Sequence, residues 1–324
     1  VIVALGALLM ALAVQKRWGR VRALAQGLLI SYAVIVLALG AGEFYFRYIY
    51  ADSRMDFTLS RENWPNRYIQ RNSLGYRDRE WTVDELAQRT TIFAVGDSFT
   101  EGWGINDPAD RWVDVLAAHL GDAYAVVNLG KSGQSTVHHL ESLNNYPYQT
   151  PDIIIYQYFL NDIDVAAKSN GMSWEYEVPP APPLADESYL VSFIYWWLNY
   201  DRLFVNVVDG RSEWEFMYAA YDNPAIWDIH RAEIERVMDY AESKNARLIT
   251  VIFPNMRDPV GSIPYVDRVA QVLEARGHPE ILKLFDQAAQ WPLEERVVSP
   301  FDSHASVGFN RMVGDVLYET YFTK

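Results

Sequence analysis

Seven consecutive residues after a short apolar run constrain this chain more than any other feature. The run, Thr-Ile-Phe-Ala-Val at 91–95, is typical of a buried strand, and Gly-Asp-Ser-Phe-Thr-Glu-Gly follows at 96–102. Ser98 at the strand end is a candidate nucleophile, provided that a base takes its proton and an acid orients the base. Asp302 and His304 supply such a pair near the other end of the chain.

Further polar residues follow apolar runs in the same way. Residues i and i+2 of an extended segment point to one side, so Asp302 can reach the ring of His304. The carboxyl ends of parallel strands converge on one crevice, which would bring Ser98, Gly133 and Asn161 together. The amides of Ser98 and Gly133, with the Asn161 side chain, could then form an oxyanion hole. Taken singly, these residues also fit ordinary roles: Ser98 as a helix cap, Asn161 in a turn, and His304 in a surface loop.

Four sequence blocks in order resemble the SGNH (GDSL) hydrolase family across most of residues 90–324. The first block is similar to Gly96-Asp97-Ser98, and the second to Asn128-Leu-Gly130-Lys-Ser-Gly133. The third is similar to Phe159-Leu-Asn161-Asp162, in which the family's glycine is replaced by Phe159. The last places Asp302 two residues before His304, where the family usually has three. The resemblance implies Ser98, His304 and Asp302 as catalytic residues, with an oxyanion hole of Ser98, Gly133 and Asn161.

The body of the chain alternates strand and helix patterns. Strands are expected at 91–95, 124–129, 153–158 and 247–253, and helices at 112–120, around 234–241, at 262–275 and at 306–321. Such alternation predicts a parallel sheet that helices cover on both faces. With the resemblance, we expect a three-layer, flavodoxin-like α/β domain at 90–324, interrupted at about 163–224, with a lead-in at 43–89.

Several other kinds of site are not supported by the sequence. Gly130-Lys131-Ser132 lacks the glycine that a phosphate-binding loop needs five positions earlier, where Ala125 stands. His119, His138 and His139 lack a second ligand cluster at metal spacing, and the chain has no cysteine. We therefore expect no metal and no cofactor.

Two apolar runs open the chain. Residues 1–14 contain no polar side chain, and residues 23–42 are apolar except for Gln26 and Ser31. About 20 residues cross a bilayer, so the second run is long enough and the first is short. The two runs, separated by a charged loop at 16–22, predict a transmembrane helical hairpin at 1–42 that binds the lipid bilayer.

Charge predicts the orientation of this hairpin. The loop carries Lys16, Arg17, Arg20 and Arg22 without an acid, which places it in the cytoplasm. The main domain is then extracytoplasmic, and we expect a bacterial inner-membrane protein with a periplasmic domain. Residues 43–324 hold 24 basic and 42 acidic residues, a formal charge of −18, which disfavours nucleic acid as a partner.

The interruption at 163–224 contains an apolar and aromatic stretch, Tyr-Leu-Val-Ser-Phe-Ile-Tyr-Trp-Trp-Leu at 189–198. Ten residues cannot span a bilayer as a helix. The stretch fits a lid helix on the sheet, a helix facing a membrane or a partner, or a wall that contacts an acyl chain or a sugar. We expect any membrane-protein partner to bind the hairpin and residues 189–204.

Two hypotheses of function follow. The first is a membrane-anchored, extracytoplasmic serine esterase or O-acyltransferase that acts on an acylated glycan, a lipid or a small ester. The second is a non-catalytic structural or accessory subunit of an integral membrane complex, for example a photosynthetic or respiratory assembly, built on an SGNH-like fold. The two altered blocks and the many aromatic residues, 11 Trp, 21 Tyr and 14 Phe, motivate the second hypothesis.

Overall fold

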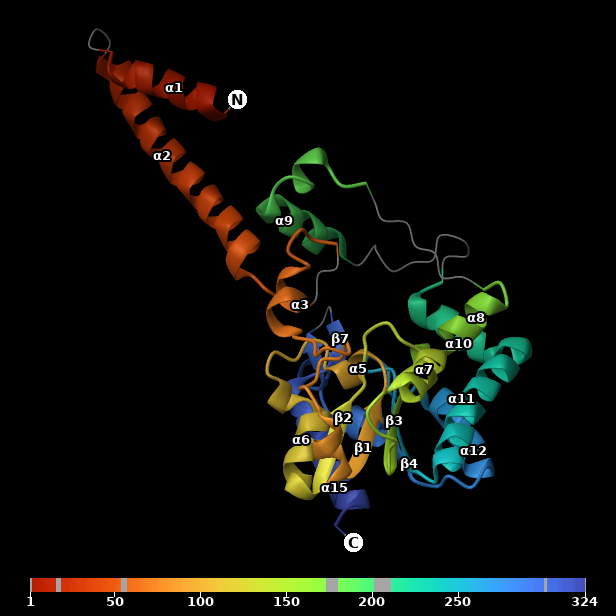
Figure 1. The fold of residues 1–324 in the computed structure, drawn as a ribbon. Coiled ribbons are helices and arrows are strands. Elements are labelled where there is room, and N and C mark those ends of the chain that lie inside the picture. The colour runs from red at the N-terminus through yellow and green to blue at the C-terminus, as the bar shows by residue number, and fades with distance from the viewer. Residues whose placement is uncertain are drawn as a thin grey trace. The chain divides into compact units, whose positions relative to one another are not determined.

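The chain divides into two compact units. The computed structural model describes residues 2–15, 19–53, 57–172, 180–200, 211–299 and 302–323. One unit comprises residues 1–63 with 180–200, and the other comprises residues 64–179 with 201–324 (Figure 1). We call them the N-terminal unit and the sheet unit.

A parallel sheet of five strands organises the sheet unit. Its order is β2-β1-β3-β4-β5, and every neighbouring pair is parallel. The strands are β1 (Thr90–Val95), β2 (Tyr124–Asn128), β3 (Ile153–Phe159), β4 (Arg247–Phe253) and β5 (Ile281–Lys283). This is the flavodoxin-like order, in which the chain changes direction across the sheet between β1 and β3. The loops that follow β1 and β3 therefore meet at the carboxyl ends of the strands.

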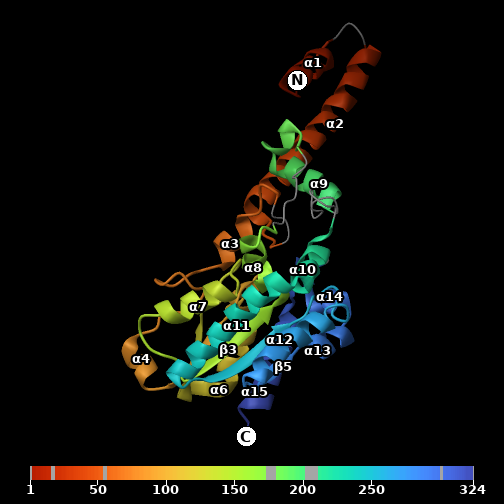
Figure 2. The same cartoon turned by 90° about the vertical axis from the view of Figure 1, so that its right-hand side faces the viewer.

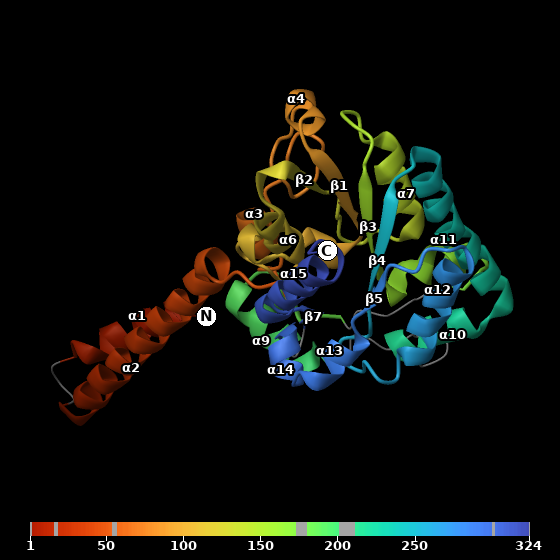
Figure 3. The same cartoon turned by 90° about the horizontal axis from the view of Figure 1, so that it is seen from below.

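Alternate residues of each strand face opposite layers. On β1, Phe93 and Val95 join one apolar core, while Ile92 and Ala94 join the other. Helices α7 (Thr136–Asn145), α11 (Pro224–Lys244) and α12 (Ile263–Ala275) cover the first face, and α6 (Trp112–Leu120) and α15 (Val307–Tyr321) cover the second (Figure 3). Because both faces are buried, the strands are mostly apolar rather than alternating between apolar and polar residues.

The remaining elements are short. A two-stranded antiparallel ribbon, β6 (Val297–Ser299) and β7 (Asp302–Ala305), carries the C-terminal acid and histidine. The other elements of this unit are α4 (Val83–Ala87), α5 (Ser98–Glu101), η2 (Pro108–Asp110), η3 (Gly121–Ala123), η4 (Leu160–Ile163), α8 (Asp164–Ser169), α10 (Glu213–Asp222), α13 (Phe285–Gln290) and α14 (Leu293–Arg296). Helix α3 (Asn63–Tyr68) lies at the junction of the two units in sequence.

Every regular element among the described residues of the N-terminal unit is a helix. It contains α1 (Ile2–Ala13), α2 (Gly19–Phe44), the π-helical turn η1 (Tyr45–Ile49), η5 (Pro183–Ala185) and α9 (Tyr189–Asn199). Helices α1 and α2 pack together, with Gly6 close to the ring of Tyr32. The continuous helix Gly19–Ile49 is the one helix among the described residues that is long and apolar enough to cross a membrane. Signal sequences near an N-terminus have the same length and composition.

The α/β class and the parallel sheet predicted from the sequence are confirmed, and so are the four predicted strands, within a residue or two. The hairpin prediction is met in part, because α1 has only 12 residues. Residues 16–18 of the expected basic loop and residues 201–204 of the expected contact segment lie outside the described residues. The boundaries expected at 43, 90, 163 and 224 stay predictions.

We expect Gly314→Ala to lower the melting temperature, because α6 and α15 pack closely at this glycine. A methyl group at Gly314 would lie 2.7 Å from Cβ of Val115 and 2.9 Å from the carbonyl oxygen of Trp112. Overpacking of this kind costs about 1–3 kcal/mol, which corresponds to a fall of about 2–10 °C by thermal unfolding in detergent. Gly308→Ala on the same helix is the control, since its neighbour Trp291 lies 3.3 Å away. Equal effects of the two substitutions would contradict the packing argument.

Candidate active site

The serine of the Gly-Asp-Ser block is the first residue of helix α5, directly after β1. The Asp97 carboxylate caps this helix by accepting a hydrogen bond from the amide of Phe99 at 2.9 Å. Gly96 allows the sharp turn, because a Cβ there would lie 2.2 Å from Oε1 of Gln157. The turn therefore holds Ser98 at the carboxyl end of a central strand.

His304 lies between the serine and an acid. Its Nε2 is 2.7 Å from Oγ of Ser98, and its Nδ1 is 2.5 Å from Oδ1 of Asp302. Asp302 is 6% exposed and accepts a second hydrogen bond from the amide of His304 at 3.1 Å. A carboxylate that accepts from Nδ1–H leaves Nε2 free to accept the serine proton. These are the geometric requirements of a serine nucleophile with its base and orienting acid.

The shifted spacing of the acid and the histidine is explained by strand β7. Both residues lie in this extended strand, so their side chains leave it on the same side. The partner strand β6 is fixed by Arg296, which is 8% exposed and donates to the carbonyl groups of Met256 and Ala288 at 2.6 and 2.9 Å. An extended strand thus brings an acid two positions away into contact with the histidine.

The loop that contains Gly133 is joined to the nucleophile helix. Glu101, the last residue of α5, is fully buried and accepts hydrogen bonds from the amide of Ser132, at 2.9 Å, and from its hydroxyl. The carboxylate also pairs with Arg71 at 2.6 Å. Gly133 itself has a φ of +75°, a conformation that favours glycine. Glu101 therefore sets the position of the loop that carries the candidate oxyanion amide.

Asn161 follows β3, the strand next to β1, within the turn η4. Its Oδ1 atom is buried without a hydrogen-bond partner among the described residues. No described hydrogen bond joins Asn161 or Gly133 to Ser98. The structure thus brings Ser98, Asp302 and His304 into direct contact and places Gly133 and Asn161 on loops at the same edge of the sheet.

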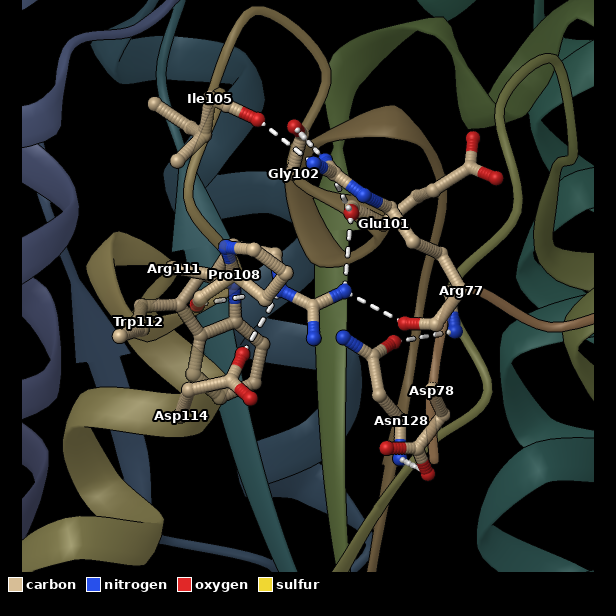
Figure 4. A network of polar contacts seen from close by, with 12 residues as sticks. Arg77, Asp78, Glu101, Gly102, Ile105, Pro108, Arg111, Trp112, Asp114 and Asn128 are labelled. Atoms are coloured by element: carbon tan, nitrogen blue, oxygen red, sulfur yellow. Dashed lines mark hydrogen bonds and ion pairs between the residues drawn. The ribbon is translucent and has the colours of Figure 1, made fainter. Parts of the chain in front are cut away.

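Two buried arginines hold the segment after α5 in place through hydrogen bonds (Figure 4). Arg77 donates to the carbonyl groups of Gly102 and Ile105, each at 2.7 Å. Arg111 donates to the carbonyl oxygen of Arg77 at 2.5 Å and pairs with Asp114 at 2.7 Å. Burial and the nearby charge of Arg111 lower the pKa of Arg77 to about 10. The two guanidinium groups donate to buried backbone carbonyls of this segment, which need hydrogen-bond partners inside the protein.

A second buried polar group lies behind the serine turn. Gln157 on β3 accepts hydrogen bonds from the amide of Asp97 at 3.0 Å and from the hydroxyl of Thr100 at 2.8 Å. Asp162 accepts from the hydroxyl of Thr136 at 3.0 Å. Burial raises the pKa of Asp97 to about 6, and burial with the charge of Asp97 raises the pKa of Asp162 well above its ordinary value.

Sequence reasoning missed several of these supporting residues. Gln157 interrupts an otherwise apolar and aromatic strand, which was a detectable signal. Glu101 closes the first motif, but nothing in the sequence pairs it with Ser132, because 31 residues separate the two. Arg77 and Arg111 resemble ordinary surface cations in the sequence, although each is 2% exposed.

One known protein family and several solved structures are similar to this chain. Residues 94–296 match the family described as the GDSL-like Lipase/Acylhydrolase family. The comparison with curated proteins gives no match.

Three of the solved structures similar to the chain are described as esterases. A carbohydrate acetylesterase family member from Sinorhizobium meliloti is 15% identical, with a TM-score of 0.39, and the alignment covers 71% of this chain and 96% of that one. The aryl esterase of M. smegmatis is 17% identical, with a TM-score of 0.35 and coverages of 71% and 97%. An acetyl xylan esterase is 12% identical, with a TM-score of 0.43 and coverages of 72% and 100%.

The two buried acids Asp97 and Asp162 predict that stability depends on pH, and Asp162→Asn should reduce this pH dependence. The raised pKa of Asp162 and Asp97 means that the folded chain holds protons that the unfolded chain has already released. Their stabilising contribution is fully present below about pH 4 and is lost as the pH rises through about 6 and above. The melting temperature of the variant should therefore rise, relative to that of wild type, from pH 4 to pH 8.

Thermal unfolding in detergent, followed by tryptophan fluorescence at each pH, measures this difference. Asp122→Asn is the control, because this aspartate is exposed and the substitution removes a carboxylate that lies outside the buried pair. A pH-independent difference for Asp162→Asn would show that the buried carboxyl does not titrate abnormally.

Proposed function

The chain belongs to the GDSL-like lipase/acylhydrolase family, and we propose that it is a membrane-anchored serine esterase or O-acyltransferase whose sheet unit works outside the cytoplasm. One observation carries the proposal: His304 contacts the hydroxyl of Ser98 through one ring nitrogen and Asp302 through the other. Nucleophile, base and orienting acid each need the other two, so the arrangement has a chemical purpose that separate structural roles do not explain.

The proposed reaction has two halves. Oγ of Ser98 attacks the ester carbonyl while Nε2 of His304 takes the hydroxyl proton, and the same nitrogen then protonates the departing alcohol oxygen. The product is an acyl-enzyme. In the second half His304 takes a proton from water or from an acceptor hydroxyl, whose oxygen attacks the acyl carbonyl. The same ring nitrogen then returns the proton to Oγ of Ser98 as the bond from the acyl carbon to that oxygen breaks. Water gives hydrolysis and a hydroxyl acceptor gives O-acyl transfer.

The negative charge that develops on the carbonyl oxygen needs donors. The amides of Ser98 and Gly133 and the side-chain amide of Asn161 are the proposed donors, because all three follow strands at the same edge of the sheet. Removing one donor of this type usually lowers kcat about 10²–10³-fold. Glu101 acts through the loop it holds rather than on the substrate.

The proposed substrate is an acylated glycan, a lipid or a small ester, as the family resemblance implies. The formal charge of −18 on residues 43–324 favours a neutral or cationic substrate over a polyanion. The alternative of a purely structural subunit is not favoured, because a scaffold gives no reason to align Ser98, His304 and Asp302.

The proposed anchor is helix α2, with α1 folded beside it. Arg20 and Arg22 lie at the start of α2, and no acid occurs before Glu43 near its other end. The positive-inside tendency therefore puts the start of α2 in the cytoplasm and the sheet unit on the opposite side, in the periplasm if the chain is from a bacterial inner membrane.

The catalytic proposal predicts that Ser98→Ala abolishes covalent labelling by a fluorophosphonate probe, because the probe reacts with an activated serine oxygen. His304→Ala should remove most labelling and lower the hydrolysis of p-nitrophenyl acetate by at least about 10³-fold. Ser303→Ala is the matched control, since this serine lies between Asp302 and His304 in sequence and should leave labelling unchanged. Labelling that persists in Ser98→Ala would overturn the proposal.

The topology proposal predicts opposite labelling of two single cysteines, which the cysteine-free chain makes practical. In intact spheroplasts, a membrane-impermeant maleimide should react with Asp52→Cys and should not react with Gly19→Cys until the cells are lysed. The reverse pattern would place the sheet unit in the cytoplasm.

A further inference from the structure

Helix α9 begins at a fixed point on the C-terminal end of α2 (Figure 2). The Glu43 carboxylate of α2 accepts hydrogen bonds from the hydroxyl of Ser188, at 2.8 Å, and from the amides of Tyr189 and Leu190, at 3.1 Å each. Gly42 allows close approach, since a Cβ there would lie 3.1 Å from the Leu190 side chain. A carboxylate at a helix N-terminus satisfies amides that have no partner within the helix. Helix α9 is thus attached at its first turn.

One face of α9 packs inward. The ring of Phe193 stacks on Phe46 at 4.2 Å between centroids, and Trp196 lies 5.5 Å from Phe57. Ser192 is 1% exposed, and its hydroxyl accepts from the amide of Leu59 at 3.1 Å. This inner face therefore includes a polar hydroxyl and is held by several contacts within the N-terminal unit.

The opposite face of α9 is apolar and exposed. Ile194 is 46% exposed, Trp197 51% and Leu198 67%. Their spacing of three and four residues places them on one side of the helix. No residue of Tyr189–Asn199 carries a charge. A helix on a water-soluble protein normally buries its apolar stripe and turns a polar side outward, whereas α9 has apolar side chains on both faces.

The end of the long helix carries exposed apolar side chains as well. Phe44, Tyr45, Tyr48 and Ile49 are between 45% and 59% exposed. They lie at the C-terminal end of the helix Gly19–Ile49, whose apolar length fits a bilayer. Aromatic residues at the end of a membrane-crossing helix are typical of the boundary between headgroups and acyl chains.

We propose that α9 is an interfacial helix whose face of Ile194, Trp197 and Leu198 enters the phospholipid leaflet at the C-terminal end of α2. The inference rests on the proposed anchoring by α2 and extends it, because it gives the unit a second lipid contact. The occupant is lipid rather than a protein, since Glu43 attaches α9 to the end of α2, whose exposed apolar side chains the bilayer would cover. Arg47, whose guanidinium lies 4.7 Å from the centre of the Tyr189 ring, supplies a cation near the headgroups.

Single spin labels on the cysteine-free full chain test this inference. The purified protein is reconstituted into vesicles of phosphatidylcholine and phosphatidylglycerol with the label at Leu198→Cys or Ile194→Cys. Collision with oxygen, which concentrates in lipid, is compared with collision with a water-soluble nickel chelate. Leu37→Cys on α2, 72% exposed, is the lipid reference, and Val260→Cys on the sheet unit, 63% exposed, is the water reference.

We expect both α9 labels to collide with oxygen more often than with the nickel chelate, as the label at Leu37 does. If the α9 labels collide mainly with the nickel chelate, as the label at Val260 does, while the label at Leu37 collides mainly with oxygen, the inference fails and the anchor stands. If the label at Leu37 also collides mainly with the nickel chelate, the anchoring itself fails. Labels at Leu198 and Ile194 that are shielded from both reagents would show that a second copy of the chain covers the face, which also overturns the inference. Fluorophosphonate labelling of each variant reports whether it is folded.

Discussion

The contact between the Gln157 side chain and the turn at Gly96 is the constraint on which the rest of the site depends. Oε1 of Gln157 accepts from the amide of Asp97 and the hydroxyl of Thr100, one on each side of the serine. It also fills the space where a Cβ of residue 96 would lie. Since Gln157 belongs to β3, which is paired with a strand on each side, the serine turn is fixed to the centre of the sheet. Precise placement of a nucleophile requires such support, because an error of about 1 Å lowers the rate strongly.

Buried charged groups, each paired with a partner, hold the loops that surround this turn. Glu101 holds the loop of Ser132 and Gly133, and Arg77 holds the carbonyl groups of Gly102 and Ile105. Burying a charge without partners costs several kcal/mol, so each group needs its hydrogen bonds to remain inside. The loops on both sides of the serine are therefore specified by polar contacts, whereas the strands beneath are specified by apolar burial.

This division explains what the sequence could predict. Apolar strands such as 153–158 could be predicted because both of their faces are buried. A contact between Asp302 and His304 could be anticipated because side chains two positions apart leave an extended strand on the same side. The contacts of Gln157, Glu101 and Arg77 were not visible, because a polar side chain in a sequence does not indicate which distant backbone group it meets. The short strand β5, of three residues, was too brief to leave a pattern. The place of α9 depends on a hydrogen bond between residues 43 and 188, which no local rule reports.

The exposed apolar side chains of the described residues are concentrated in one of the two units. Of the 25 large hydrophobic residues that are exposed, 21 belong to the N-terminal unit, which has 84 residues, and only Val83, Ile229, Val260 and Val307 belong to the sheet unit. In water this surface would draw chains together, because apolar area is driven out of contact with water. The sheet unit has the opposite character, with two closed apolar cores and most of the acidic residues. The proposed bilayer contact would resolve this contrast, because lipid would cover the exposed apolar side chains of α2 and α9 while the sheet unit remained in water.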